Sequence, residues 1–174
     1  VGAWAVDKAY LFHHSVGTWV LESTQMGASG SELGASVDTD GVSAILGAPG
    51  VANGEAWIMR RSGSGTWSRE TTLAMAGLQR QGHSVAISID RAVVGAPLGA
   101  SGGAAVYTWS GSWDAGSVLP ATSADSGDQI GYSVDLDADR VVVGAPGDDL
   151  AVDQGSVRVF AWSGSAWTEE ARLL

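Results

Sequence analysis

The chain alternates short apolar segments with turns rich in Gly, Asp and Ser along its whole length. The segments are five or six residues long and rich in Val, Ile and aromatic residues, and some alternate strictly, as in Ser156-Val157-Arg158-Val159-Phe160. Segments of this length and composition, bounded by such turns, are typical of β-strands. No stretch of twelve residues shows the apolar period of a helix. The pattern therefore predicts an all-β protein.

The segments recur as a unit of about 48 residues, which three motifs mark. A Gly-Ala-Pro tripeptide begins at Gly47, Gly95 and Gly144. A Ser-Val pair begins at Ser36, Ser84 and Ser133. A tryptophan recurs with a more variable spacing at Trp19, Trp67, Trp113 and Trp167. Because the signals coincide, the chain is a tandem repeat.

Each repeat contains four predicted strands: one with Gly-x-Ser-Val, one ending in Gly-Ala-Pro, an alternating third strand, and a fourth that starts at the repeated Trp. Four antiparallel strands within a repeat of this length are typical of a β-propeller blade. The expected repeats are 1–30, which is incomplete, then 31–77, 78–124 and 125–174. We therefore predict one domain over residues 1–174, a partial or half ring of about three and three-quarter blades.

These motifs resemble the FG-GAP repeat, which builds the integrin α head and many bacterial surface proteins. The resemblance covers almost the whole chain, is strongest over residues 125–174, and implies a β-propeller. The Phe-Gly that names the family is replaced, because Leu33, Gln81 and Ile130 stand before the glycine. Leu and Ile keep an apolar plug at this position, and the middle repeat loses it.

Calcium is the cofactor that the resemblance raises, since integrin-type repeats carry Asp-x-Asp-x-Asp-Gly-x-x-Asp between their first two strands. A calcium ion takes six or more oxygen ligands, and no repeat here has the complete motif. The candidate ligands are Asp135, Asp137 and Asp139 in the first turn of the last repeat, and Asp148, Asp149 and Asp153 in its next loop. The alternative is that these carboxylates are solvated or cap backbone amides of their turns.

Ligands of a propeller usually meet the loops of one face, because loops vary while strands hold the frame. The candidate loops are 50–54, 98–103 and 147–154. The candidate binding residues are Trp4, Asn53, Ser101, Asp148, Asp149 and Asp153. Ser101 lies in a Gly-x-Ser-x-Gly sequence, but two strands flank it, whereas a nucleophile elbow needs a strand and a helix. We interpret it as part of a connecting loop.

Composition narrows the function. The net charge is −10 with one Lys and eight Arg, so the chain lacks the basic patch of a nucleic-acid-binding surface. No apolar run reaches the length of a membrane span, and no catalytic constellation is evident. The leading hypothesis is a non-enzymatic binding or adhesion module, secreted or on the cell surface as part of a larger protein, with a protein or glycan ligand on its loop face.

The incomplete ring leaves three arrangements open. The chain is a fragment of a longer propeller, two copies pair through open blade edges to complete one ring as a self-assembling structural unit, or four blades close alone. An unclosed array exposes strand edges, which favour pairing with another chain. A carbohydrate-binding or enzyme-scaffold propeller is a further alternative because the chain has eight Trp, although four of them occupy one repeat position.

Overall fold

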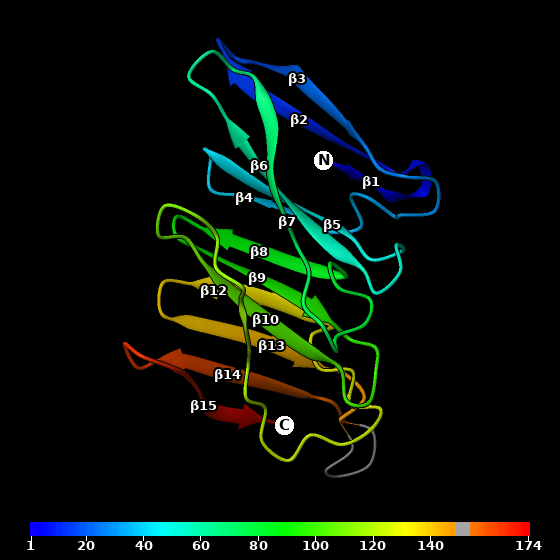
Figure 1. Ribbon diagram of the computed structural model, residues 1–174, viewed down its shortest axis with the longest axis vertical. Coiled ribbons are helices and arrows are strands. Elements are labelled where there is room, and N and C mark those ends of the chain that lie inside the picture. Colours follow the sequence, from blue (N-terminus) through cyan, green and yellow to red (C-terminus); the bar gives the residue numbers. More distant parts are fainter. Residues whose placement is uncertain (149–153) are drawn as a thin grey trace.

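Four antiparallel sheets follow one another along the longest axis of the molecule, with the chain ends in the first and last sheets (Figure 1). The computed structural model describes residues 1–148 and 154–174. The predicted all-β fold of propeller blades is confirmed. Within the described ranges, no helix has the length and apolar character needed to cross a membrane.

Each sheet is one blade, with its strands in chain order from one edge to the other. Blade 1 has three strands, β1 (Gly2–Ala3), β2 (Lys8–Ser15) and β3 (Thr18–Met26), with a 3₁₀ turn η1 (Trp4–Val6) after β1. Blade 2 consists of β4 (Val37–Thr39), β5 (Ser43–Ala48), β6 (Glu55–Arg61) and β7 (Trp67–Leu73). Blade 3 consists of β8 (Ser84–Ser88), β9 (Arg91–Ala96), β10 (Gly103–Thr108) and β11 (Ser117–Val118). Blade 4 consists of β12 (Ser133–Asp137), β13 (Arg140–Ala145), β14 (Ser156–Trp162) and β15 (Trp167–Leu173).

The fourth strand of blade 3 differs from the sequence expectation. We expected it to begin at Trp113, but β11 begins at Ser117 and has two residues. Trp113 instead bridges Trp109, and the Asp114 carboxylate accepts hydrogen bonds from the backbone N–H groups of Thr108 and Gly116. These contacts, together with the positive φ of Gly116, turn the chain away from the sheet. In blades 2 and 4 the fourth strand begins at the Trp as predicted.

The blades pack face against face. We call the side of a blade that meets the next blade its forward face, and the opposite side its backward face. Blade 2 contributes Ile45, Ala56 and Leu73 to the core shared with blade 3, and blade 3 contributes Tyr107 from its backward face. Blade 3 contributes Val93 and Ala104 to the core shared with blade 4, which contributes Phe160 and Trp167. Each junction thus sets small or aliphatic side chains against larger ones, the complementarity that a close-packed core needs.

The glycine of Gly-Ala-Pro allows the next blade to approach closely. A Cβ on Gly47 would overlap the carbonyl oxygen of Gly82 in blade 3, and a Cβ on Gly95 would overlap that of Gly131 in blade 4. The serine of Ser-Val also crosses the junction. The backbone N–H of Val85 donates to Ser36 Oγ at 3.0 Å, and that of Val134 donates to Ser84 Oγ at 3.0 Å. The two most regular motifs of the sequence are therefore the contacts that join one blade to the next.

A polar residue fills the plug position of the middle repeat. Gln81 is buried like Leu33 and Ile130 at the equivalent positions. Its side-chain amide donates to the carbonyl of Met75 at 3.0 Å, and its amide oxygen accepts from the Met75 N–H at 2.6 Å. Because these bonds satisfy the buried amide, its burial does not carry the cost of an unpaired polar group. The apolar plug is lost as predicted, and a hydrogen-bonded plug replaces it.

Each junction also holds an indole of the later blade against a charged group of the earlier blade. Trp67 Nε1 donates to Glu22 at 2.9 Å, and Arg61 Nε donates to the same carboxylate at 2.8 Å. At the next junction, Trp113 Nε1 donates to the Glu70 carboxylate at 3.3 Å. At the last junction, the Arg91 guanidinium lies 5.7 Å from the ring centres of both Trp162 and Trp167. Such cation–π and charge-assisted contacts orient the repeated tryptophans.

Acid is expected to weaken the junction between blades 1 and 2. The hydrogen bond from Arg61 is the largest effect on the pKa of Glu22, and desolvation, the second largest, opposes it; with the further hydrogen bond from Trp67, the pKa is lowered to about 2. A carboxylate with a lowered folded-state pKa stabilises the protein fully above its unfolded-state pKa, and this stabilisation is lost as the pH falls toward 2. The stability difference between wild type and Glu22→Gln, measured by urea unfolding, is therefore expected to shrink steadily from pH 5 to pH 2.5. A difference that stays constant over this range would contradict the assignment.

Candidate functional site

Three adjoining hollows form a groove across blades 2, 3 and 4, with Trp4 of blade 1 also on its border, and all three are lined by Arg80. Their volumes are ≈ 300, ≈ 210 and ≈ 280 Å³. We call them together the inter-blade groove. Its lining includes Trp4, Glu32, Pro49, Asn53, Arg80, His83, Leu98, Gln129 and Tyr132. Because one side chain borders all three hollows, a single extended ligand could contact Arg80 along the whole groove.

The groove is built from the same turn in successive repeats. Glu32, Arg80 and Gln129 each precede the buried plug residue, and each has a positive φ, of 56°, 62° and 57°. This region of φ is uncommon for residues other than glycine. In each repeat the next-but-one residue is a glycine that also has a positive φ, so the turn is tight. The regular spacing of the turn therefore places one functional side chain per blade at the groove.

The polar centre of the groove is an ion pair between blades. Arg80 Nη2 lies 3.0 Å from Glu32 Oε2, and both side chains are about one-third exposed. The guanidinium has five N–H donors, so its pairing with one carboxylate oxygen leaves donors for a further acceptor. Beside it, the His83 ring lies 4.7 Å from that of Tyr132, and His83 Nδ1 is 3.1 Å from the Tyr132 carbonyl oxygen. Aromatic and proline side chains thus flank a cation whose other donors have no hydrogen-bond partner among the described residues 1–148 and 154–174.

The predicted binding residues fall into three groups. Trp4 and Asn53 line the groove, as does Leu98 from the predicted loop 98–103. Ser101 lies apart from it, in the connection between β9 and β10, where its carbonyl accepts a hydrogen bond from the Ile130 N–H at 2.9 Å. Asp149 and Asp153 lie outside the described residues.

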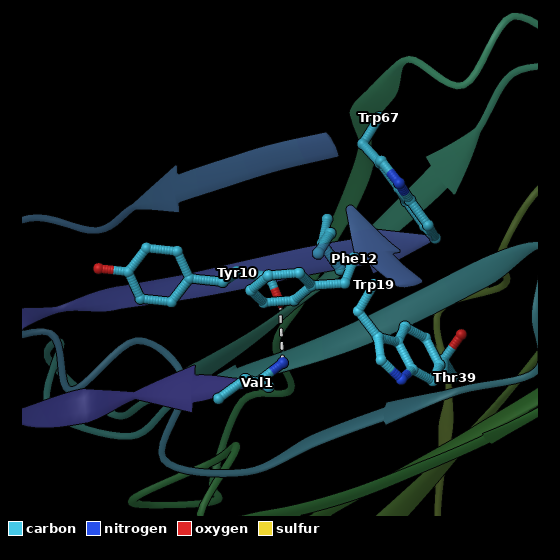
Figure 2. A pocket seen from close by; sticks show the side chains of 7 residues that line it. Val1, Tyr10, Phe12, Trp19, Thr39 and Trp67 are labelled. Atoms are coloured by element: carbon cyan, nitrogen blue, oxygen red, sulfur yellow. Dashed lines mark hydrogen bonds between the residues drawn. The ribbon is translucent and has the colours of Figure 1, made fainter. Parts of the chain in front are cut away.

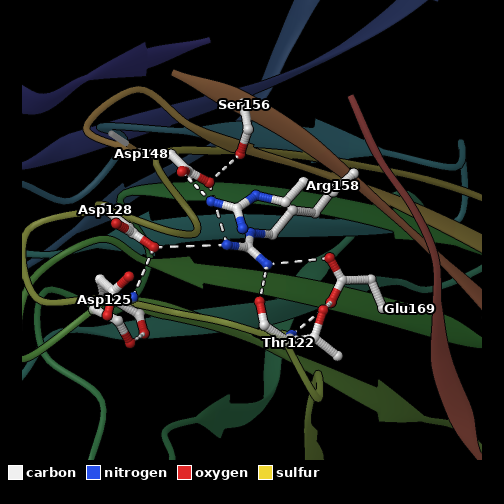
Figure 3. A network of polar contacts seen from close by, with 10 residues as sticks. Thr122, Asp125, Asp128, Asp148, Ser156, Arg158 and Glu169 are labelled. Carbon is white, nitrogen blue, oxygen red and sulfur yellow. Dashed lines mark hydrogen bonds and ion pairs between the residues drawn. The ribbon is translucent and has the colours of Figure 1, made fainter. Parts of the chain in front are cut away.

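Asp148 is buried in a network of ionic contacts around Arg158 (Figure 3). Arg158 Nη2 lies 3.2 Å from Asp148 Oδ2 and 3.6 Å from Asp128 Oδ2, and Nη1 lies 3.1 Å from Glu169 Oε1. Nη1 also donates to the Thr122 carbonyl at 2.6 Å, and Arg172 contacts the other oxygen of Asp148. The structure therefore commits the Asp148 carboxylate to two guanidinium groups. The contacts of Arg158 with Thr122 and Asp128 join the segment before blade 4 to β14.

The other predicted calcium ligands lie around the β12–β13 hairpin. Asp135 accepts a hydrogen bond from the Leu136 N–H at 2.9 Å, and Asp139 pairs with Arg140 at 3.1 Å. Asp137 ends β12, and its backbone lies opposite that of Arg140 in the register of the β12–β13 hairpin. Among the residues that the structure describes, no group of three or more acidic or histidine side chains gathers as metal ligands would. Calcium binding at these residues or at Asp148, Asp149 and Asp153 stays a prediction.

Comparison with known proteins identifies the repeat. Residues 113–160 match the FG-GAP repeat. The match runs from the end of blade 3 into β14, so the FG-GAP resemblance expected from the sequence is confirmed for this segment. The matched segment contains the third Gly-Ala-Pro, Asp128, Asp148 and Arg158, whereas Glu169 and Arg172 of the ionic network lie beyond it.

A crystal structure of a protein from Lactobacillus plantarum has a similar fold, with a TM-score of 0.61 and 15% sequence identity. The similarity covers 97% of this chain and 49% of that chain, so the present chain spans about half the length of the solved protein. At this identity the comparison shows the fold alone. A comparison with curated proteins finds no match.

Arg158, Glu169 and Arg172 were not predicted as an ionic network. The sequence did carry one signal, because Arg158 occupies the third-strand position that holds Trp57 and Ala105 in the two preceding repeats. The strand register shows this equivalence, since Trp57, Ala105 and Arg158 each pair with the residue before the glycine of Gly-Ala-Pro. An arginine at a position that is apolar in other repeats indicates a buried partner of opposite charge.

Proposed function

We propose that the chain is a non-enzymatic binding module whose ligand lies in the inter-blade groove. The observation that carries the proposal is that one repeat position brings Glu32, Arg80 and Gln129 to a groove shared by three blades. Side chains of rigid blades at regular intervals form a preorganised surface, which lowers the entropic cost of binding. The FG-GAP match supports a repeat scaffold but names no ligand, so we infer the ligand from the side chains that line the groove.

The ligand that suits this groove is an extended protein segment with an acidic side chain. The unused donors of Arg80 match a carboxylate, while Trp4, Leu98 and Tyr132 expose apolar surface beside it. Arginine and aromatic side chains are enriched among the residues that dominate protein–protein binding energy. We further propose that this binding takes place outside the cell, as suits an acidic chain with one lysine.

The test is selection of a displayed random peptide library on the immobilised chain, followed by titration calorimetry of the selected peptides. Arg80→Ala is expected to weaken binding by about tenfold or more, the effect of removing a central arginine. Arg60→Ala is the matched control, because Arg60 is also about one-third exposed and pairs with a carboxylate at 3.1 Å, but lies on β6 outside the groove.

Binding that Arg60→Ala leaves within about twofold of wild type would support the groove. The proposal fails if no peptide binds, or if Arg80→Ala binds the selected peptides as tightly as wild type. A glycan array run in parallel assigns the ligand class, since glycan hits that Arg80→Ala abolishes would replace the peptide as ligand.

A further inference from the structure

The forward face of blade 4 carries apolar side chains at positions that are buried in the preceding blades. Val142 is 40% exposed, whereas Ile45 and Val93 at the equivalent position are each 0% exposed. Leu173 is 56% exposed, and its equivalent Leu73 is 3% exposed. Val157 is likewise exposed, and Ala56 and Ala104 at its position are buried. Blade 4 thus keeps the composition of a face that packs against another blade.

This face is also hollowed where a neighbour would approach. A groove of ≈ 420 Å³ is lined by Tyr132, Gly144, Pro146, Val157 and Leu173. A Cβ on Gly144 would meet Ser133 of its own blade, whereas the same atom on Gly47 or Gly95 would overlap the following blade. The forward face of blade 4 therefore has the shape of an internal junction surface.

The backward face of blade 1 carries the complementary aromatic side chains. Phe12 occupies the same repeat position as Met59, Tyr107 and Phe160. Each of these residues lies three positions after the residue that pairs with the repeated glycine, and in blade 1 that pair is Ala9 with Gly2. Those three side chains are buried against the preceding blade, and Phe12 is 40% exposed. Phe12 also lines a hollow of ≈ 480 Å³ together with Tyr10 and Trp19, and this hollow reaches the junction with blade 2, where Leu11, Thr39 and Trp67 line it (Figure 2). Blade 1 thus exposes large side chains on its backward face, of the kind that pack against the aliphatic forward face of the preceding blade at an internal junction.

The polar contacts of a junction are divided between the same two faces. Trp19 is the repeat equivalent of Trp67 and is 71% exposed, with its ring beside that of His14 in its own blade. Glu170 lies three residues after its tryptophan, as Glu22 and Glu70 do, and those two carboxylates accept from an indole of the next blade. Arg140 begins β13 as Arg91 begins β9, and Arg91 stacks on the tryptophans of the next blade. Blade 4 therefore presents an indole-binding pair, and blade 1 presents an indole.

We propose that two copies of this chain associate head to tail, with the forward face of blade 4 in each copy packed against the backward face of blade 1 in the other. One chain carries both halves of the junction at opposite ends of the molecule (Figure 1), which is the requirement for a heterologous contact. Two such contacts close the assembly and leave neither face exposed. The similar solved chain is about twice as long, so its fold accommodates the elements of two copies.

The test is the mass in solution, measured by light scattering on a sizing column from micromolar to near-millimolar concentration. Wild type is expected to form a dimer. Phe12→Lys and Val142→Lys each place a charge in both junctions of the dimer. Each variant alone is therefore expected to be monomeric, with a dissociation constant of the dimer that is at least about tenfold higher than that of wild type. Both side chains are 40% exposed, so the lysine ammonium can stay in water in the monomer. Circular dichroism and the melting temperature check that both variants fold.

Mixing the two variants distinguishes head-to-tail from symmetric pairing. A Val142→Lys copy keeps its blade 1 face and a Phe12→Lys copy keeps its blade 4 face, so the mixture is expected to form a heterodimer with one intact junction. Ile89→Lys is the control, because Ile89 is exposed in the β8–β9 turn, away from both faces, and should remain dimeric. The proposal is overturned by a monomer at every concentration, by an assembly larger than a dimer, by either charged variant alone remaining dimeric, or by a mixture that stays monomeric.

Discussion

Arg158→Met is expected to lower the free energy of unfolding by about 3–5 kcal/mol, because it removes a cation that three buried carboxylates share in one network. Arg158 is 0% exposed, and Asp128, Asp148 and Glu169 all approach its guanidinium within 3.6 Å. Methionine fills a similar volume, so most of the loss is electrostatic rather than the result of a cavity. Urea unfolding followed by circular dichroism measures the change.

Arg140→Met is the matched control for this prediction, with both methionine variants compared in the Phe12→Lys background, because Arg140 lies on the face that is proposed to pack against a second copy. Arg140 also pairs with two carboxylates, Asp139 and Glu170, in the same blade, but its side chain is half exposed. Water and salt screen such a pair, so its loss is expected to cost at most about 1 kcal/mol. If the two methionine variants lost equal stability, the network around Arg158 would contribute no more than an exposed ion pair.

Gly95→Ala is expected to destabilise the protein by about 1–3 kcal/mol, the cost of forcing a methyl group into a filled space. The added Cβ would overlap the carbonyl oxygen of Gly131, a backbone atom of the next blade, so the two blades must move apart. The φ of Gly95 is not positive, so the effect is steric contact between blades and not local backbone strain. The midpoint of urea unfolding measures it.

The same substitution at Gly144 provides the comparison. Its nearest atoms belong to Ser133, whose side chain can rotate away. Replacing a glycine by alanine also reduces the entropy of the unfolded chain. In the Phe12→Lys background, which is expected to be monomeric and to leave the forward face of blade 4 open, Gly144→Ala is therefore expected to be neutral or to stabilise by up to about 1 kcal/mol. Equal destabilisation by both alanines would show that the glycine serves the strand itself and not the approach of the next blade.

The repeat motifs predicted the blades because each motif residue has a contact that recurs. Gly95 and Ser84 meet the following blade through backbone atoms, so their identity is tied to the fold and visible in a single sequence. Trp113 was misleading, because the hydrogen bonds that Asp114 accepts delay the strand that the Trp starts in other repeats. A local side-chain contact thus overrode the repeat pattern.

The groove and the ionic network were harder to predict, because they depend on which residues of different blades become neighbours. Asn53 and Trp4 were identified from their loops, but Arg80 and Glu32 were not, since they stand in a turn that looks like any other polar turn in the sequence. Asp148 was interpreted as a candidate metal ligand because its partners, Arg158 and Arg172, lie 10 and 24 residues away on strands. A periodic pattern indicates strands and faces, whereas charge pairing across strands requires the register.

The division of every blade into a forward and a backward face has a consequence for how such a chain can change in evolution. Because the blades meet their neighbours through recurring glycine, serine and indole contacts, duplication or deletion of one repeat unit adds or removes a junction without creating a mismatched surface. Copy number is therefore free to drift by whole units at little cost to any single interface. Insertions of a few residues are tolerated only in the connecting loops, since a partial unit would shift the glycine away from the carbonyl that it accommodates.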